Sequence, residues 1–290
     1  LNLFSEMGQS YGMSEGRPQE QINYLKKNNI LNNVNSILDL GCYEGDFLSH
    51  FPNSIKKTGI DIDLPSIEKA KRLYPDTTFI CQDFENFDTG EKHDLIIMCH
   101  VLEHLKNPLT TLKNILRASH QNTKLLIEVP ILENGFTNDI NGFFSVQHLT
   151  HFSRSSLKSF FDLSGWKILK FDEQKDYNGT RVLATPNLSS QPKNINPHRE
   201  KSVLYSYLEH WYKRLNVIER KLIEFSGKKK YIIWGAGLHT EFIFNKTSFF
   251  HNNKDAEFIF FDSDPLKIGK TYKNISIVSP FDIHVDDWVD

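Results

Sequence analysis

Two carboxylates flank a glycine-containing turn near the start of the chain. Asp39 lies in a short apolar run, and Glu44 lies between Gly41 and Gly45. Glycines let the backbone approach a ligand closely, whereas carboxylates at the turn repel a pyrophosphate and favour a ligand that carries positive charge. Asp61 follows a second apolar run about 20 residues beyond the glycines, where an acid accepts hydrogen bonds from ribose hydroxyls in a βαβ unit. These residues predict a site for a nucleoside with a cationic group.

Two histidines are candidates for removing a proton from an acceptor. His148 and His151 lie where a long polar and aromatic insertion, residues 131–150, meets the next predicted helix. Loops of this length in a compact domain are usually functional or disordered. Histidine titrates near neutrality, which suits a base that deprotonates a hydroxyl. In the structural alternative, one histidine caps the helix and the other packs under Phe152.

The elements that must position these residues form an α/β pattern. Seven apolar runs predict strands, most of them parallel and buried: residues 37–40, 58–60, 78–81, 93–99, 124–130, a run that starts at Trp166, and 180–184. Between the strands, apolar residues recur at helical spacing after helix-start signals at Pro18, Pro65, Asn107-Pro108 and Ser153. His100 and Val101 follow the strand 93–99, at the sheet edge where open α/β sheets hold their ligands.

Three segments carry a resemblance to a known family. Residues 39–45 (Asp-Leu-Gly-Cys-Tyr-Glu-Gly) and 59–63 (Gly-Ile-Asp-Ile-Asp) resemble the first two motifs of class I S-adenosylmethionine-dependent methyltransferases, and residues 101–105 (Val-Leu-Glu-His-Leu) are similar to the segment after the fourth strand. The ligand of that family has a sulfonium and an ammonium group, consistent with the acidic turn. Tyr43 departs from the pattern, since many members have glycine there. The resemblance implies a Rossmann-like α/β fold with a seven-stranded sheet.

The resemblance also implies the residues of a cofactor site. The cofactor would be S-adenosyl-L-methionine, with S-adenosyl-L-homocysteine as the product. The cofactor would contact residues of the glycine turn and of the ends of the second, third and fourth strands. These residues are Asp39, Gly41, Cys42, Glu44, Gly45, Asp61, Ile62, Asp83, Phe84, His100 and Val101. His148 and His151 would lie beside the sulfonium.

Three further residues are expected to contact the substrate. They are Phe143 and Gln147 in the insertion and Tyr11 in the leader, which in related enzymes often folds over the cofactor. A surface aromatic is the alternative for Tyr11. Glu103 and His104 resemble a metal-binding pair, but packing and hydrogen bonding at a helix start explain them more simply. We therefore expect no metal.

A second α/β unit follows the first. We expect a methyltransferase domain over residues 1–186, a linker at 187–200, a linking helix at 201–227 and an incomplete Rossmann-like domain at 228–290. The helix has a coiled-coil-like seam formed by Leu204, Leu208, Trp211, Leu215, Ile218 and Leu222. This seam packs within the chain or joins two chains in a homodimer. Gly235-Ala-Gly237 opens the last unit as a structural module, a pocket for a sugar-nucleotide handle, or an NAD site.

The order of these units resembles bacterial deoxysugar C-methyltransferases and methyltransferases of capsule and lipopolysaccharide gene clusters. Those deoxysugar enzymes have a zinc domain in front, which this sequence does not contain, and a Glu-His pair where this chain has Gln147-His148. The missing carboxylate favours an oxygen acceptor over carbon. We therefore expect O-methylation of a sugar, a sugar nucleotide or a glycan precursor. The alternatives are a C- or N-methyltransferase acting on a deoxysugar or other small molecule, and a non-catalytic nucleotide-binding subunit.

Composition argues against several other classes. The chain has 34 Lys and Arg against 36 Asp and Glu, which gives no basic field for nucleic acid. No apolar run reaches the ~18 residues of a membrane span. Cys42, Cys81 and Cys99 lie in or beside predicted buried strands without metal-ligand spacing, as expected in a reducing cytoplasm. The chain begins at Leu1 and stops within an unfinished αβ repeat, so we expect a piece of a longer protein.

Overall fold

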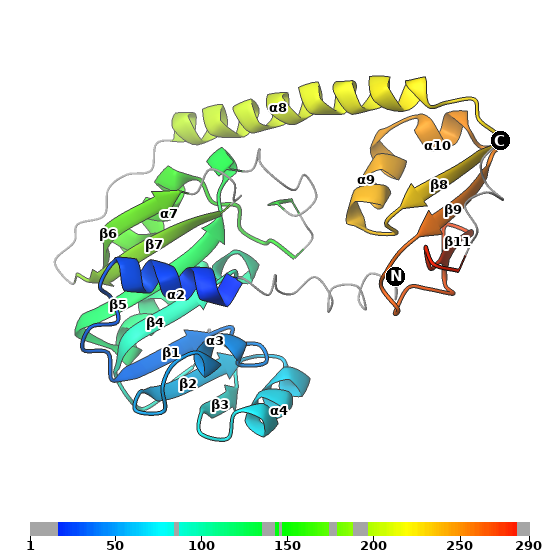
Figure 1. Cartoon of the computed structure of the whole chain (residues 1–290). Coiled ribbons are helices and arrows are strands. Elements are labelled where there is room, and N and C mark those ends of the chain that lie inside the picture. Colours follow the sequence, from blue (N-terminus) through cyan, green and yellow to red (C-terminus); the bar gives the residue numbers. More distant parts are fainter. Residues whose placement is uncertain are drawn as a thin grey trace. The chain divides into compact units, whose positions relative to one another are not determined.

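The computed structural model describes residues 17–83, 87–134, 143–144, 147–173, 179–187 and 197–282. These residues belong to two compact units, one within residues 15–208 and one within 209–290 (Figure 1). Each unit has a β-sheet of its own. Within the described residues, no helix combines the length and apolar character needed to cross a bilayer.

The first unit is built on a seven-stranded sheet in the order β3-β2-β1-β4-β5-β7-β6. Its strands are β1 (Ser36–Leu40), β2 (Lys56–Asp61), β3 (Thr78–Cys81), β4 (His93–Cys99), β5 (Ser119–Pro130), β6 (Trp166–Glu173) and β7 (Gly179–Pro186). Strands β1 to β5 pair in parallel, whereas β7 is antiparallel to both neighbours. All seven predicted strands are confirmed, and β5 begins earlier than its apolar run.

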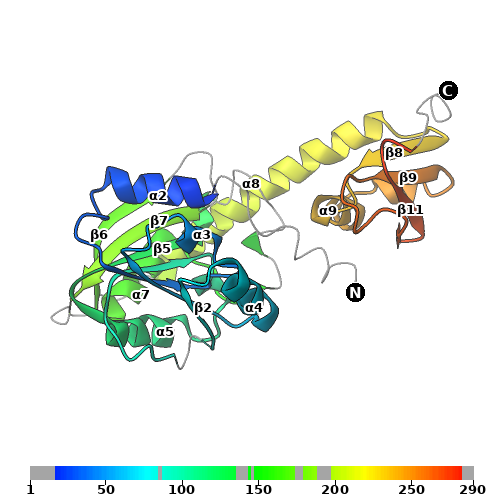
Figure 2. The ribbon, with the colours of Figure 1, turned by 60° about the horizontal axis from the view of Figure 1, so that its bottom comes forward.

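Helices cover both faces of this sheet because alternate strand residues point to opposite sides. Ile37 belongs to the core beneath α2 (Arg17–Lys27), α3 (Asp46–Ser49) and α4 (Leu64–Leu73). Leu38 belongs to the core beneath α5 (Pro108–Ile115) and α7 (Arg154–Leu163). Figure 2 shows α2 on one side of the sheet and α5 and α7 on the other.

Short helical turns and caps join these elements. The 3-10 helices are η1 (Leu102–His104), η2 (Leu116–Ala118) and η3 (Leu132–Asn134). The Asp63 side chain accepts a hydrogen bond from the backbone N–H of Ser66 and caps α4. Ser153 caps α7 in a reciprocal capping box with Ser156, as predicted from its position before the apolar stripe.

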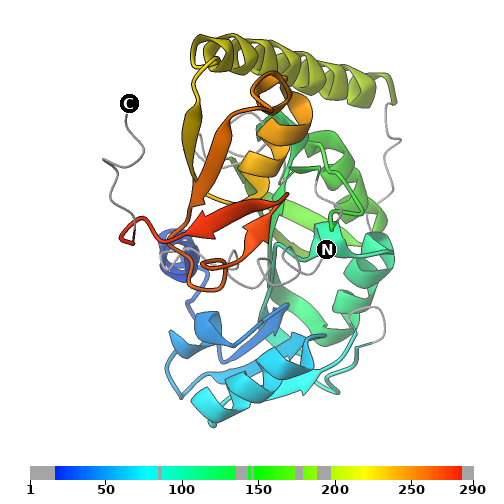
Figure 3. The same ribbon diagram turned by 90° about the vertical axis from the view of Figure 1, so that its right-hand side faces the viewer.

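The second unit has a four-stranded sheet in the order β10-β11-β9-β8. Its elements are β8 (Lys230–Trp234), α9 (Leu238–Lys246), α10 (Phe249–Asn252), β9 (Glu257–Phe261), β10 (Thr271–Tyr272) and β11 (Ile275–Val278). Strands β8, β9 and β11 are parallel, as in a βαβ unit, and β10 forms a hairpin with β11. Figure 3 gives another view of its orange and red strands.

Helix α8 (Pro197–Glu224) begins before the predicted residue 201 and ends before residue 227. Its predicted seam is only partly buried, since Trp211 is buried whereas Leu208 is 48% exposed. Among the described side chains of the helix, Tyr207 is the most buried, at 2% exposure. The three cysteines lie in or beside strands as expected, and Cys81, the last residue of β3, is exposed whereas Cys42 is buried.

Candidate functional site

The turn after β1 depends on two glycines with positive φ. Gly41 has φ of +85°, and a Cβ atom there would lie 2.2 Å from Cγ2 of Val101. Gly45 has φ of +84°, and its Cβ would lie 2.5 Å from the Phe79 ring. Both positions require glycine for conformation and for space. The turn therefore passes close to Val101, which follows β4, as predicted for neighbouring strand ends.

The acid at the end of β2 is joined to this turn. The backbone N–H groups of Tyr43 and Asp63 donate to Oδ2 and Oδ1 of Asp61 at 2.8 and 2.9 Å. Each carboxylate oxygen has two lone pairs, and Asp61 is partly exposed, so it retains capacity to accept from ligand hydroxyls. Tyr43 has φ of +48°, the left-handed region in which glycine is common.

Asp39 is a buried acid beneath the turn. It is 5% exposed, and burial together with the negative charge of Asp61 raises the pKa of its carboxyl to about 7. A cationic group bound near these two carboxylates would lower that pKa, because opposite charge favours the ionised form. The pair of acids is therefore suited to a positively charged ligand.

The other predicted cofactor residues differ in accessibility. Glu44 forms an ion pair with Lys69 at 2.7 Å. Cys42 is buried in the core, so its backbone is the part available to a ligand, and burial raises the pKa of its thiol far above the ordinary value. Ile62 and Asp83 are exposed beside the ends of β2 and β3. Phe84 and Tyr11 lie outside the described residues.

His100 lies between two buried acids. Its φ is +54°, and its Nδ1 and Nε2 atoms lie 3.3 Å from Glu103 and 3.9 Å from Glu128. Burial lowers the pKa of His100, but the two carboxylates outweigh it and raise the pKa to about 9. Glu128 also pairs with Arg181 at 3.2 Å and accepts a 3.0 Å hydrogen bond from Gln21.

The insertion returns to the end of β4 through Glu103. The backbone carbonyl of Glu103 accepts hydrogen bonds from the N–H groups of Leu149 and Thr150 at 2.9 and 3.0 Å. These bonds bring His148 to His104, with ring centroids 4.8 Å apart. The sequence predicted that Glu103 and His104 take part in packing and hydrogen bonding at a helix start. Their positions just after the end of β4 were the signal that placed them near the site.

The two predicted catalytic histidines have different surroundings. His148 is partly buried, and its Nδ1 donates to the carbonyl of Phe143 at 2.9 Å. His151 is exposed, with its ring 4.6 Å from that of Phe144. Partial desolvation lowers the pKa of both imidazoles, and for the more exposed His151 the neighbouring His148 lowers it further. The ring centroids are 6.4 Å apart, so the structure brings both histidines into one region.

Tyr207 is a residue of this region that the sequence did not reveal. Its ring packs 5.5 Å from Phe143 and 5.2 Å from Phe144. Hydrogen bonds from Ser153 and Ser155 to Glu200 hold the start of α8 against α7. The first part of α8 therefore packs against the two phenylalanines, and through them it supports residues 147–151, called here the histidine-containing segment. Phe143 is 1% exposed and so contributes to packing. Gln147 is exposed and accepts a hydrogen bond through its backbone carbonyl.

The acid beside the glycine turn of the second unit is hydrogen-bonded to other residues of that unit. Asp262 follows β9, and its Oδ2 accepts hydrogen bonds from the backbone N–H of Ala236 at 2.9 Å and from Nζ of Lys267 at 3.0 Å. Asp262 and Lys267 are both buried. This acid is therefore engaged within the fold, unlike the more exposed Asp61, which weakens the NAD alternative.

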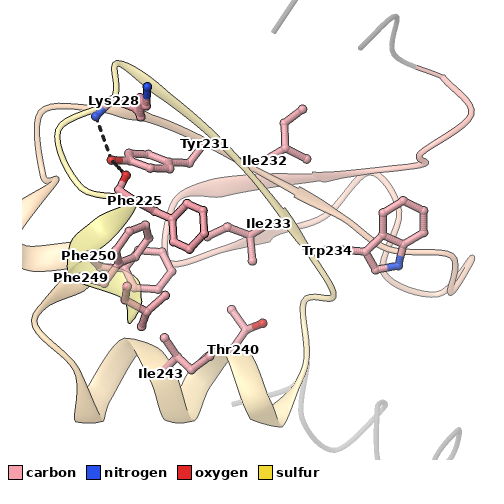
Figure 4. A pocket seen from close by; sticks show the side chains of 11 residues that line it. Phe225, Lys228, Tyr231, Ile232, Ile233, Trp234, Thr240, Ile243, Phe249 and Phe250 are labelled. Atoms are coloured by element: carbon pink, nitrogen blue, oxygen red, sulfur yellow. Dashed lines mark hydrogen bonds between the residues drawn. The ribbon is translucent and has the colours of Figure 1, made fainter. Parts of the chain in front are cut away.

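A pocket of about 390 Å³ lies beside β8 and α9 of the second unit, and its lining includes Trp234 and Thr240. Figure 4 shows aromatic and aliphatic side chains lining it, and its few polar side chains include Lys228 and Thr240. The Tyr231 hydroxyl is engaged, since it donates to the carbonyl of Phe225 and accepts from the N–H of Lys228. The lining is apolar and does not resemble a phosphate-binding site.

Two curated proteins share sequence with this chain. The 235L protein of Invertebrate iridescent virus 6, described as a methyltransferase, is 26% identical over 133 residues, which cover 43% of this chain and 50% of that protein. Malonyl-[acyl-carrier protein] O-methyltransferase of Anoxybacillus flavithermus is 28% identical over 42% of this chain and 49% of its own length. The chain thus spans about half the length of these curated relatives.

Solved structures share the fold. An S-adenosylmethionine-dependent methyltransferase from Clostridium acetobutylicum superimposes with a TM-score of 0.50 and 12% identity, over 64% of this chain and 97% of that one. The plantazolicin methyltransferase BpumL, in complex with a pentazolic desmethylPZN analog and SAH, superimposes with a TM-score of 0.52 and 16% identity, over 63% of this chain and 90% of that one. The seven-stranded sheet is accordingly the class I methyltransferase Rossmann-like fold, as predicted. The family described as "Methyltransferase domain" matches residues 14–170. Because this match covers more than half of the chain, the chain belongs to the methyltransferase domain family.

Proposed function

We propose that this chain transfers a methyl group from S-adenosylmethionine to a hydroxyl of a sugar, a sugar nucleotide or a glycan precursor. The observation that carries the cofactor assignment is the pairing of the glycine turn with Asp61, above the buried acid Asp39. This arrangement offers carboxylates where a phosphate-binding turn offers only N–H groups. Solved neighbours of the same fold, such as BpumL, contain SAH.

Each part of the cofactor has candidate partners in the chain. Asp39 and the turn from Gly41 to Gly45 would hold the methionine part, with the negative charge stabilising its ammonium and sulfonium groups. Asp61 would accept hydrogen bonds from the ribose hydroxyls, and Ile62 and Asp83 would lie along the adenine. When bound, this cofactor supplies an electrophilic methyl group, and the chain supplies mainly positioning.

The acceptor side would be formed by the histidine-containing segment. His148 donates through Nδ1 to the Phe143 carbonyl, which leaves Nε2 with a lone pair. Burial holds the pKa of His148 below its ordinary value, which favours the neutral ring. As the acceptor oxygen forms its bond to the methyl carbon, Nε2 would take the hydroxyl proton. The other product is S-adenosylhomocysteine.

Two observations favour a sugar hydroxyl as the acceptor. Gln147 precedes His148 where the similar deoxysugar C-methyltransferases have a carboxylate, and loss of that group favours oxygen over carbon. The order of a methyltransferase unit, a long helix and a small parallel α/β unit also resembles enzymes of surface-glycan gene clusters.

Calorimetric titration with S-adenosylmethionine and S-adenosylhomocysteine tests the cofactor assignment. Wild-type protein should bind both, and Asp61→Ala should weaken binding at least about tenfold, as expected for the loss of about 1.4 kcal/mol or more of charge-assisted hydrogen bonding. Asp76→Ala, an exposed aspartate of the same unit, should bind like the wild type. Equal affinity of Asp61→Ala and wild type would refute the ribose role. Transfer of radiolabelled methyl groups to a panel of nucleotide-linked sugars, amines and carbon acids then tests the acceptor class.

A further inference from the structure

Three side chains at the end of β4 converge on one point. Glu103 and His104 lie in η1, and His148 is brought to them by the returning insertion. Each offers one ligand atom, a carboxylate oxygen or an imidazole nitrogen, and these atoms all lie within 4.8 Å of one another. The sequence separates His148 from the other two by more than forty residues, so the convergence arises only from the fold.

Both histidines are held in the tautomer that leaves Nε2 free to bind an ion. Nδ1 of His104 lies 2.9 Å from the carbonyl of Gln147, and Nδ1 of His148 lies 2.9 Å from the carbonyl of Phe143. A carbonyl can only accept, so each Nδ1 carries a hydrogen, and in the neutral ring Nε2 then has the lone pair. Metal-binding histidines commonly use the same arrangement, with the second ring nitrogen donating to a backbone carbonyl.

The Glu103 carboxylate has unused acceptor capacity. It is 1% exposed, and its Oε2 has no hydrogen-bond partner among the described residues. His100 approaches Oε1 to 3.3 Å as an ion pair, and a carboxylate offers about four acceptor sites. Nε2 of His104 also faces Oε1, at 3.9 Å. A lone pair that faces a buried carboxylate is unfavourable unless a positive charge lies between them.

We propose that Glu103, His104 and His148 bind a divalent transition-metal ion of the Zn²⁺ type. A proton could separate Glu103 from His104, but it could not also engage His148, whereas a metal ion binds all three donors. Two imidazoles and one carboxylate form a ligand set of catalytic zinc sites, which keep a further position open. With bonds of about 2.1 Å, tetrahedral donors are roughly 3.4 Å apart, so side-chain movements of about 1 Å close the site.

Such an ion would change how the acceptor loses its proton, a consequence that rests on the proposed function. With Nε2 of His148 on the metal, that nitrogen is a ligand and no longer the base. An acceptor hydroxyl bound at the open position would have a lowered pKa and would release its proton to water. Its oxygen would then form the bond to the methyl carbon as the bond from sulfur to that carbon breaks.

The experiment measures metal binding without cofactor or acceptor. The chain is freed of metal with a chelator and titrated with Co²⁺, whose visible absorption reports nitrogen and oxygen ligands, and then with Zn²⁺ by calorimetry. We expect one equivalent of Co²⁺ with intense visible bands, displaced by Zn²⁺. Glu103→Gln and His148→Gln should each weaken Zn²⁺ binding at least about tenfold. His151→Gln is the matched control, since this nearby histidine lies outside the cluster, and it should bind like the wild type.

Two results would overturn the proposal. One is a wild-type protein that gives no visible Co²⁺ bands and no saturable Zn²⁺ binding. The other is a His148→Gln variant that binds Zn²⁺ as tightly as wild type. His148 is only partly buried, so this variant should fold even if Glu103→Gln does not, and thermal unfolding of both variants checks this. Because no step uses S-adenosylmethionine, loss of the metal site and failure of the cofactor assignment are separate outcomes.

Discussion

The backbone N–H of Tyr43 donates a 2.8 Å hydrogen bond to Oδ2 of Asp61 and so joins the turn after β1 to the end of β2. The bond requires Tyr43 to hold φ of +48°, a conformation that costs a residue with a side chain about 1–2 kcal/mol. This explains how a tyrosine occupies a position where the similar methyltransferases often have glycine. The hydrogen bond thereby fixes the position of the turn relative to the acid.

Gly41→Ala should destabilise the turn more than a glycine substitution elsewhere. The new Cβ would lie 2.2 Å from the Val101 side chain, in addition to the strain of positive φ. We expect a loss of roughly 2–3 kcal/mol in the free energy of unfolding and weaker cofactor binding. Gly90→Ala is the control, since Gly90 also has positive φ, at +68°, but has nothing within 4 Å of the added atom. In urea denaturation, Gly90→Ala should lose only about 1 kcal/mol in the free energy of unfolding. Equal losses for the two variants would contradict the close contact between position 41 and Val101.

Asp39→Asn should increase stability above neutral pH. The folded chain holds the pKa of Asp39 at about 7, above the ordinary value of 3.8. Between these values the folded state binds more protons than the unfolded state, so the free energy of unfolding falls as pH rises and stays low above pH 7. The asparagine variant avoids ionisation, and we expect it to be roughly 1–3 kcal/mol more stable than wild type at pH 8.

The stability gain at pH 8 should shrink at pH 5, where Asp39 is protonated in the folded chain. Denaturant unfolding at both pH values measures this difference, and an unchanged difference would contradict the raised pKa. The same variant should bind S-adenosylmethionine more weakly, because it removes negative charge near the cationic groups. Asp39 would then lower the stability of the folded chain and raise its affinity for S-adenosylmethionine, a combination that is common at functional sites.

The substitution Tyr207→Ala tests whether α8 supports the histidine-containing segment. Tyr207 is 2% exposed, and we expect a loss of roughly 3–5 kcal/mol in the free energy of unfolding of residues 15–208. Tyr205→Ala on the same helix removes a tyrosine that is 65% exposed and should change stability by less than about 0.5 kcal/mol. Thermal unfolding monitored by circular dichroism compares the two, and similar midpoints would contradict the packing role.

His148→Gln should reduce methyl transfer without weakening cofactor binding. Its ring lies against His104, and loss of the group that removes the acceptor proton, either as the base or as a ligand of the proposed metal ion, should lower kcat by about 10²–10⁴. His151→Gln should lower kcat by less than about tenfold, because His151 is exposed and packs on Phe144. Turnover at saturating S-adenosylmethionine separates the two, and full activity of the first variant would remove His148 from the mechanism.

The sheet and the cofactor turn could be predicted from sequence because their signals are local. The apolar runs of β1 to β7 and the glycines at 41 and 45 lie within short windows, and strand ends of a parallel sheet meet at one edge. The proposed metal-binding cluster of Glu103, His104 and His148 could not be predicted from the sequence. His148 is brought to it by backbone hydrogen bonds of Leu149 and Thr150, and no periodicity in the sequence encodes these bonds.

Helix α8 shows a second limit of the sequence. Its heptad-like spacing predicted the helix and the buried Trp211, but it missed Tyr207, which contacts with Phe143 and Phe144 bury, and it included Leu208, which is 48% exposed. Periodicity marks an apolar stripe and does not say which part of it finds a partner.

A crystal structure of the chain soaked with S-adenosylhomocysteine tests the central claim most directly. We predict density for the ligand against the turn from Gly41 to Gly45, with its ribose hydroxyls within hydrogen-bond distance of Asp61 and its sulfur towards the end of β4. A turn free of ligand at saturating concentration, or a ligand whose ribose lies away from Asp61, would contradict the account.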